Sequence, residues 1–401
     1  MSAITENKQG LKVLITGSII QLFLGIIYVW SVFVRPVSDF YSWDINDVKL
    51  MTSFMLCFFV VGILIGGILQ VKIGAQKVVL IGGMMLAGGM LISAFLTPGI
   101  VWIMYITYGV IGGFGVGAGY NANISCAQKW FPQNRGFATG ISVCAFGFST
   151  VIFAPLIRAL IAQFGLRLTF IILAAAFFAV VIILFRFVRL PDDSGQAGAP
   201  SPAAQALLAR KQFTMTETIK TKEFYFITLS LMLATAAFFI LNPSFISLAS
   251  DRGLGESIGT VVVMLTGVAN ALGRLGAPLL SEKIGREKAA LTIILTTAVG
   301  ALLLCFSFIQ SYAFMATIAV IAFCYGGYSG IYPVLTADYF GIKNVGSNYG
   351  AVMVGFAVSA FTFPIIIAQI SEVTVKFYVL ASFALIGAIL MVLLMKTGKK
   401  G

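Results

Sequence analysis

Hydrophobic residues form long, nearly unbroken runs along this chain, and mostly short polar segments separate one run from the next. A helix needs roughly 20 mostly apolar residues to cross the hydrocarbon core of a bilayer. Measured against that length, the runs predict spanning helices over residues 12–34, 50–70, 78–96, 100–128, 137–163, 168–188, 224–247, 258–280, 289–309, 312–336, 346–370 and 375–395. The pattern therefore predicts an all-α integral membrane protein with twelve transmembrane helices embedded in the lipid bilayer.

The composition excludes most soluble and metal-dependent classes of protein. Hydrophobic residues make up 59% of the chain and charged residues only 10%, against about 25% charged residues in a typical soluble protein. There is no histidine, which removes histidine-ligated metal sites and Ser-His-Asp triads. The five cysteines stand inside apolar runs without a CxxC pair. We therefore expect no metal, no cofactor and no enzymatic activity.

The distribution of charge predicts the orientation in the membrane. The chain carries 26 Lys and Arg against 14 Asp and Glu, a formal net charge of +12. Basic residues concentrate on the cytoplasmic side of membrane proteins. With a cytoplasmic N-terminus, six cations fall outside: Arg35, Lys49, Arg158, Arg167, Arg252 and Lys376. Most of the others fall in cytoplasmic loops. We expect both termini to be cytoplasmic, the protein to lie in the cell inner (plasma) membrane, and nucleic acid not to be a partner.

An internal repeat relates the two halves of the chain. The sequence Lys-Ile-Gly at residues 72–74 follows the second predicted helix, and it recurs at residues 283–285 after the eighth. Residues 129–132, at the end of the fourth predicted helix, correspond to residues 338–341 at the end of the tenth. Both pairs have nearly the same offset, which predicts a duplicated six-helix unit.

One long polar segment, residues 189–223, lies between the two sets of six predicted helices. Its first part has the Pro, Gly, Ser and Ala content of a flexible linker. Basic residues near its end favour a short amphipathic helix on the cytoplasmic face, with a plain solvated linker as the alternative. We therefore expect an N-terminal six-helix bundle over residues 1–188, a cytoplasmic linker over 189–223 and a C-terminal six-helix bundle over 224–401.

The loops after the second and eighth predicted helices resemble the helix 2–3 signature of the major facilitator superfamily, G-x-L-x-D-[RK]-x-G-[RK]-[RK]. The second copy keeps Glu282, Lys283, Gly285 and Arg286, whereas the first has Val71 at the acidic position. The resemblance covers the whole chain and implies a secondary transporter, working as a monomer, with alternating access around a midplane site between its two halves. It also implies that the loop steadies one access state. For the first copy, a simple basic anchor is the alternative.

Arg274 is a basic residue predicted to lie deep inside a membrane helix. It stands eight residues before Glu282, which places it roughly 12 Å into the helix at 1.5 Å per residue. An arginine at that depth costs about 2.5 kcal/mol or more, so we expect it to face the bundle interior and to meet an anion. Because the acidic residues lie in predicted loops or at helix ends, the sequence favours an anionic substrate. Asn270, one turn earlier, can orient the guanidinium or reach a substrate hydroxyl.

Several segments are similar to the oxalate/formate antiporter family, namely residues 28–31, 129–132, 135–136, 213–217, 273–274 and 347–350. The resemblance implies that Arg274 is the substrate arginine. It also implies a surrounding set of aromatic positions, three of which keep tyrosine and two of which carry other residues: Tyr28, Tyr120, Tyr325, Phe146 and Ser329. Phe356 replaces a lysine of the oxalate exchanger. With one cation in place of two, the site suits a monoanion better than doubly charged oxalate.

These observations predict a secondary active transporter of small monocarboxylates such as lactate or pyruvate, coupled to protons by symport. An oxalate/formate-type anion exchanger is the alternative. The chain is also similar to proton-linked monocarboxylate porters, which have an acidic residue at the position of Asn270. Here the proton would travel with the substrate as the neutral acid, or would bind Asp251 or Glu256 at the outer ends of the seventh and eighth helices. Exchange of one monoanion for another across the membrane is a further alternative to symport.

Overall fold

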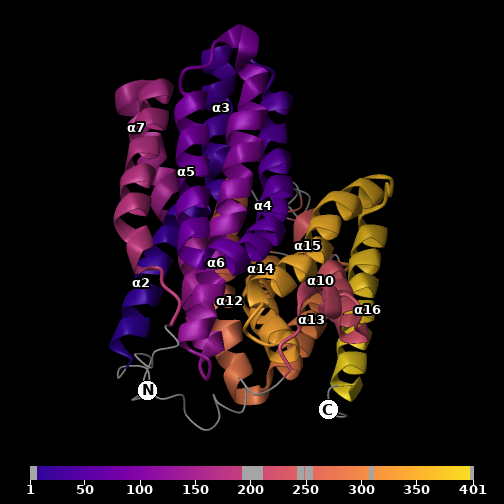
Figure 1. Ribbon diagram of the computed structural model, residues 1–401. Helices are drawn as coiled ribbons and strands as arrows, with labels where there is room; N and C mark the ends of the chain where they lie inside the picture. The colour runs from indigo at the N-terminus through magenta and orange to yellow at the C-terminus, as the bar shows by residue number, and fades with distance from the viewer. Residues whose placement is uncertain (1–6, 192–210, 242–247, 249–255, 307–310, 398–401) are drawn as a thin grey trace. The chain divides into compact units, whose positions relative to one another are not determined.

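The computed structural model describes residues 7–191, 211–241, 248, 256–306 and 311–397 (Figure 1). Every regular element among these residues is a helix. Nine of the described stretches are long and apolar enough to cross a membrane: Lys8–Tyr41, Ile45–Ile73, Ala75–Ser93, Pro98–Trp130, Arg135–Phe187, Lys222–Leu241, Tyr312–Phe340, Val345–Ile367 and Val373–Thr397. The stretch Arg135–Phe187 includes two of the twelve predicted spans, and two further helices, Glu256–Ile284 and Arg286–Leu303, are not among the nine stretches. The described helices therefore cover each of the twelve predicted spans at least in part.

The first predicted helix consists of α2 (Lys8–Leu24), a 3-10 turn η1 (Gly25–Val29) and α3 (Trp30–Tyr41). Asn7 begins it, and its side chain accepts a hydrogen bond from the Gly10 N–H, which satisfies one of the unpaired donors of a helix end. The second and third predicted helices are α4 (Ile45–Ile73) and α5 (Ala75–Ser93). These elements are ordinary apolar helices, except for the change of winding at η1.

The fourth predicted helix is also composite, with the 3-10 turn η2 (Pro98–Ile103), the π-helix η3 (Tyr105–Gly112) and α6 (Gly113–Trp130). The long helix α7 (Arg135–Leu184) holds the fifth and sixth predicted helices, and η4 (Phe185–Phe187) follows it. Inside α7 the backbone leaves helical geometry at Gly165, where φ is 74°. Glycine adopts positive φ at little steric cost, so Gly165 marks the turn between the two predicted helices.

The second half begins with the one-turn helix α9 (Met215–Thr218), which is stabilised by a capping box between Thr214 and Glu217. Six long helices follow: α10 (Lys222–Leu241), α12 (Glu256–Ile284), α13 (Arg286–Leu303), α14 (Ser311–Phe340), α15 (Val345–Ala368) and α16 (Val373–Thr397). They correspond in order to the seventh to twelfth predicted helices.

The repeated Lys-Ile-Gly sequence has the same backbone conformation in both halves. Gly74 follows α4 with φ 85° and ψ 150°, and Gly285 follows α12 with φ 95° and ψ 148°. This region of backbone conformation is accessible essentially to glycine alone. The repeat in the sequence is therefore also a repeat in the structure.

The contacts between helices divide the chain into two compact units. Unit 1 comprises residues 1–212 and 341–351, and unit 2 comprises residues 213–340 and 352–401. In unit 1, α6 packs against α4 and α5, and α2 packs against α7; in unit 2, the most extensive packing joins α12 to α14. The start of α15 thus belongs to unit 1. The predicted three-part division stays a prediction, and residues 192–210 of its linker lie outside the described residues.

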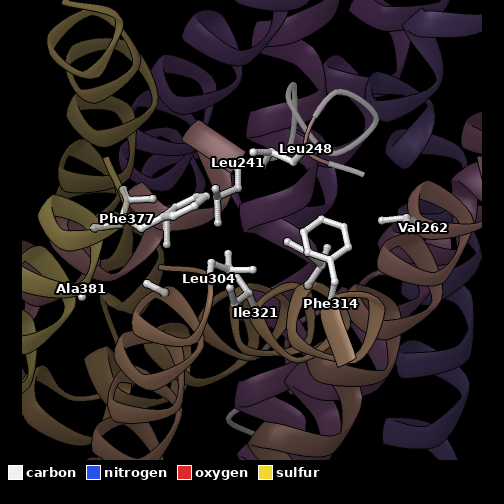
Figure 2. Close-up of a cluster of buried hydrophobic side chains, with 12 residues drawn as sticks. Leu241, Leu248, Val262, Leu304, Phe314, Ile321, Phe377 and Ala381 are labelled. Carbon is white, nitrogen blue, oxygen red and sulfur yellow. The ribbon is translucent and has the colours of Figure 1, made fainter. Parts of the chain in front are cut away.

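Apolar side chains from α10, α12, α13, α14 and α16 gather with Leu248 and Leu304 in one core cluster of unit 2 (Figure 2). The cluster comprises Ala237, Leu241, Leu248, Val262, Ala301, Leu304, Phe314, Ile318, Ile321, Phe377, Leu380 and Ala381. Within a bilayer, lipid tails are as apolar as these side chains, so close packing rather than escape from water holds the helices together. Phe238 of α10 packs against this cluster, which connects the core to the residues described next.

Candidate functional site

Arg274 lies in the middle of α12 and is almost completely buried, with 1% of its surface exposed. Its Nε donates a hydrogen bond of 3.0 Å to Oδ1 of Asn270, one turn earlier on the same helix. A hydrogen bond at Nε fixes the plane of the guanidinium group. The two terminal nitrogens then form the edge that matches a carboxylate in a bidentate manner.

Glycines bring α12 and α14 into backbone contact beside this arginine. A Cβ atom on Gly273 would overlap the carbonyl oxygen of Phe323, and a Cβ on Gly326 would overlap the carbonyl oxygen of Asn270. The same Gly326 Cβ would lie 2.9 Å from Oδ1 of Asn270. Gly326, directly after Tyr325, therefore serves the packing of α14 on Asn270. Small residues at such crossings are a general feature of membrane helices.

Tyr325 and Phe356 belong to one aromatic cluster of unit 2, whose other members, Phe238 and Phe239, were not singled out in the sequence. The Tyr325 ring stacks on Phe238 with centroids 3.9 Å apart and meets Phe239 edge-on at 5.6 Å. Phe239 also meets Phe356 edge-on at 4.9 Å. Tyr325 and Phe356 are both buried, with 3% and 5% of their surfaces exposed. Ser329 is partly buried on α14, one turn after Tyr325.

Tyr28, Tyr120 and Phe146 form a second aromatic cluster, in unit 1. The ring of Phe146 lies edge-on to Tyr28 at 5.4 Å and to Tyr120 at 4.8 Å. Phe59 of α4 completes the cluster, with centroid distances of 5.3 Å to Tyr120 and 5.9 Å to Phe146. The turn η1 carries Tyr28, and a Cβ atom on Gly25 would overlap the carbonyl oxygen of Phe146. Close backbone contact with α7 thus sets the position of Tyr28.

A buried glutamine supports the Tyr120 part of this cluster. The Gln21 amide nitrogen donates to the carbonyl oxygen of Tyr120 at 3.2 Å and to the hydroxyl of Ser142 at 3.3 Å. Gln21 is fully buried in α2, so it joins α2 to both α6 and α7. An isolated glutamine in an apolar run is the signal that could have indicated this role.

The predicted site residues are divided between the two units, with Tyr28, Tyr120 and Phe146 in unit 1 and Asn270, Arg274, Tyr325, Ser329 and Phe356 in unit 2. Asp251 lies outside the described residues. Glu256 is the first residue of α12, and only its backbone is described. Among the described residues, no group of three or more Cys, Asp or Glu could hold a metal ion.

The sequence profile of the Major Facilitator Superfamily matches the chain twice, over residues 14–229 and 227–401. The chain belongs to the Major Facilitator Superfamily. The two matches correspond to the two halves that the internal repeat predicts, so the fold is the all-α membrane fold of this superfamily, with two six-helix halves.

Relatives within the superfamily include carriers of organic anions. The chain is 26% identical to an oxalate:formate antiporter of Oxalobacter formigenes over 81% of this chain and 76% of the relative. It is also 26% identical to monocarboxylate transporter 13 of Rattus norvegicus over 66% of this chain and 59% of the relative. Among solved structures, the proton:xylose symporter XylE has a TM-score of 0.72 at 14% identity, over 95% of each chain. This last similarity concerns the fold alone.

Only one of the two copies of the superfamily signature loop has an acidic residue at the signature's acidic position. In the second copy, Arg286 forms ion pairs with Asp338 at 3.5 Å and Glu282 at 3.7 Å, and donates to the hydroxyl of Ser281 at 2.6 Å. In the first copy, Val71 occupies the acidic position, with 57% of its surface exposed. The charged network of the signature is therefore built at the end of α12 and α14, within unit 2.

Proposed function

We propose that this superfamily member is a secondary active transporter of small monocarboxylates, with Arg274 as the residue that binds the substrate carboxylate. The single observation that carries the proposal is the burial of Arg274 in the middle of α12 with its Nε hydrogen-bonded to Asn270. An arginine inside the membrane is costly and by default marks a functional site. A guanidinium of fixed plane provides the geometry that a carboxylate requires.

The proposed substrate is a monoanion such as lactate or pyruvate. Phe356, at the position of the second cation of the oxalate exchanger, is buried against Phe239. An aromatic ring there supplies an apolar surface for a short carbon chain and no charge for a second carboxylate. Tyr120, Tyr28, Phe146 and Ser329 are the remaining residues that we propose to bind the substrate.

Proton-coupled symport is the proposed mode of transport. The sequence has no histidine, so the proton would move with the substrate as the neutral acid or on Asp251 or Glu256. The protein would act as a monomer in the cell inner membrane, with both termini in the cytoplasm and protons and the monocarboxylate as its partners. An oxalate/formate-type exchanger is the second candidate, and the antiporter of Oxalobacter formigenes favours it.

Uptake of radiolabelled lactate by proteoliposomes, with and without an inward proton gradient, tests the proposal. We expect uptake that the gradient stimulates and that unlabelled pyruvate inhibits. Uptake that ignores the gradient but rises when the vesicles are preloaded with a monocarboxylate would replace symport by exchange. Absence of lactate and pyruvate transport, together with rapid oxalate–formate exchange, would contradict the proposed substrate class.

A further inference from the structure

Four basic residues lie at one end of unit 1, at the start of α2 and in and directly after η4: Lys8, Lys12, Arg186 and Arg189. All four are exposed. The ammonium group of Lys12 lies 4.3 Å from the centre of the Phe187 ring, so the start of α2 is in contact with η4. Nε of Arg189 donates a hydrogen bond of 2.8 Å to the carbonyl oxygen of Arg186. We call these four residues the basic edge of unit 1.

Hydrogen bonds to α6 hold the backbone of the basic edge in place. The carbonyl oxygen of Arg189 accepts a hydrogen bond from the Trp130 indole at 2.6 Å and one from the Cys126 thiol at 3.1 Å. The side-chain amide of Asn7, directly before α2, donates to the carbonyl oxygen of Trp130 at 3.1 Å. Val188 is fully buried. Trp130 therefore joins the start of α2 to the segment after η4, and the exposed cations stand on an anchored backbone.

The described part of unit 1 has no acidic residue at this end. Its described acidic residues lie at the end of α3 and the start of α4, and they are Asp39, Asp44 and Asp47. Lys12 and Asp39 stand about 27 positions apart along α2, η1 and α3, which is roughly 40 Å at 1.5 Å per residue. This separation is several times the Debye length of about 8–10 Å. The four cations of the basic edge form no ion pair with a described residue.

The second half has carboxylates at the corresponding place. In the internal repeat, Lys129 near the end of α6 corresponds to Asp338 near the end of α14. Asp338 forms an ion pair with Arg286 at 3.5 Å, and the hydroxyl of Tyr339 donates to a carboxylate oxygen of Glu287 at 3.1 Å. Unit 2 thus balances its cations there with its own acidic residues, whereas the described part of unit 1 offers the basic edge no carboxylate.

We propose that the basic edge of unit 1 binds the phosphate group of an anionic phospholipid. Basic pockets at the ends of membrane helices attract anionic headgroups, and the planar fork of arginine matches phosphate oxygens. The Phe187 ring beside Lys12 has 37% of its surface exposed, and it offers an apolar contact to the part of the lipid below its phosphate. A lipid therefore matches both the charge and the apolar surface, whereas a free phosphate ion uses the charge alone. The proposal does not depend on the identity of the transported substrate.

Binding of fluorescently labelled phosphatidylglycerol to the purified full chain in detergent tests the proposal, with labelled phosphatidylcholine as the zwitterionic reference. We expect the parent to bind phosphatidylglycerol more tightly than phosphatidylcholine. The double variant Arg186→Gln, Arg189→Gln should bind phosphatidylglycerol about 25-fold more weakly, because each cation near the membrane surface contributes about fivefold. Equal affinity of the parent for the two lipids overturns the proposal, and so does unchanged affinity for phosphatidylglycerol in a folded double variant.

The double variant Arg35→Gln, Arg158→Gln is the matched control. Both of these arginines are exposed and belong to unit 1, so the control loses the same number and type of charges in the same unit. We expect it to bind phosphatidylglycerol like the parent. An equal loss of affinity in the two double variants would make net charge responsible and overturn the proposal. If the variant of Arg186 and Arg189 does not fold, Lys12→Gln takes its place, with an expected loss of about fivefold and with an unchanged affinity as the contradicting result.

Two further measurements distinguish the lipid from other occupants of the basic edge. An excess of inorganic phosphate at constant ionic strength should not displace phosphatidylglycerol, and displacement would make a free anion the ligand. Asp192 and Asp193 follow the basic edge in the sequence and lie outside the described residues. The double variant Asp192→Asn, Asp193→Asn should bind phosphatidylglycerol like the parent, and tighter binding would identify this part of the chain as the occupant. Either contrary result overturns the proposal.

Discussion

At the scale of single residues, charge in the membrane is the most informative feature of this protein. Arg274 is placed by its helix in a fully buried position, and Asn270 fixes its orientation. Both could be identified from the sequence, because a charged side chain in a long apolar run is rare and costly. The aromatic partners could not. The chain has 35 Phe, and nothing in their spacing separates Phe59, Phe238 and Phe239 from rings that face lipid.

Phe356→Lys tests whether a missing cation determines the choice of substrate. The new ammonium group would stand in the aromatic cluster formed with Phe239 and Tyr325 and would compensate a second carboxylate. We expect the ratio of oxalate to lactate uptake by proteoliposomes to rise about tenfold or more. Phe356→Met, which changes shape but not charge, should leave the ratio close to that of the parent. A folded Phe356→Lys protein with an unchanged ratio would refute the charge argument.

At the scale of helices, hydrophobic runs predicted where the elements lie but not how they are wound. The lipid allows only segments whose backbone groups are hydrogen-bonded internally, so long apolar runs are read reliably as helices. The 3-10 turn η1 and the π-helix η3 interrupt two of these runs, and hydropathy has no signal for either. The break at Gly165 agrees with the predicted boundary between residues 163 and 168.

The repeated glycine at the end of α12 gives a prediction about stability. Gly285 has φ 95° and open space around its Cα, so Gly285→Ala meets backbone strain alone. We expect a loss of about 1–3 kcal/mol in the free energy of unfolding, seen as a lower melting temperature in detergent. Gly267→Ala is the control, since Gly267 lies in the same helix with open space and no positive φ. If both variants melt like the parent, the strain argument is wrong.

At the scale of the whole molecule, the duplication was predictable because two loops repeat at nearly the same offset, and the superfamily profile matches both halves. The assignment of residues 341–351 to unit 1 was not predictable. It depends on contacts of Gly346 and Gly350 with α4 and α6. The chain has 42 glycines, and nothing in the sequence distinguishes these two from the others. Long-range contacts between small residues leave no pattern in hydropathy.

The distribution of cations predicts the orientation of the whole chain. Two lysines, Lys49 near the beginning of α4 and Lys72 near its end, are exposed. The excess of basic residues on the cytoplasmic side predicts that Lys49 lies outside and Lys72 in the cytoplasm. In a cysteine-free background, a membrane-impermeant maleimide added to intact cells should modify Lys49→Cys, and Lys72→Cys only after lysis. The reverse pattern would invert the predicted topology and place both termini outside.

The central claim is that Arg274 binds the substrate carboxylate, and lactate uptake by proteoliposomes containing Arg274 variants tests it most directly. Truncation of one member of a buried charge pair costs about 2–5 kcal/mol, which corresponds to a loss of roughly 30-fold to several thousandfold. We expect both Arg274→Ala and Arg274→Lys to reduce uptake to this extent, since a lysine cannot reproduce the planar fork. Arg158→Ala, the same change at an exposed arginine of α7, should transport like the parent. Full lactate uptake by a folded Arg274→Ala protein would contradict the account.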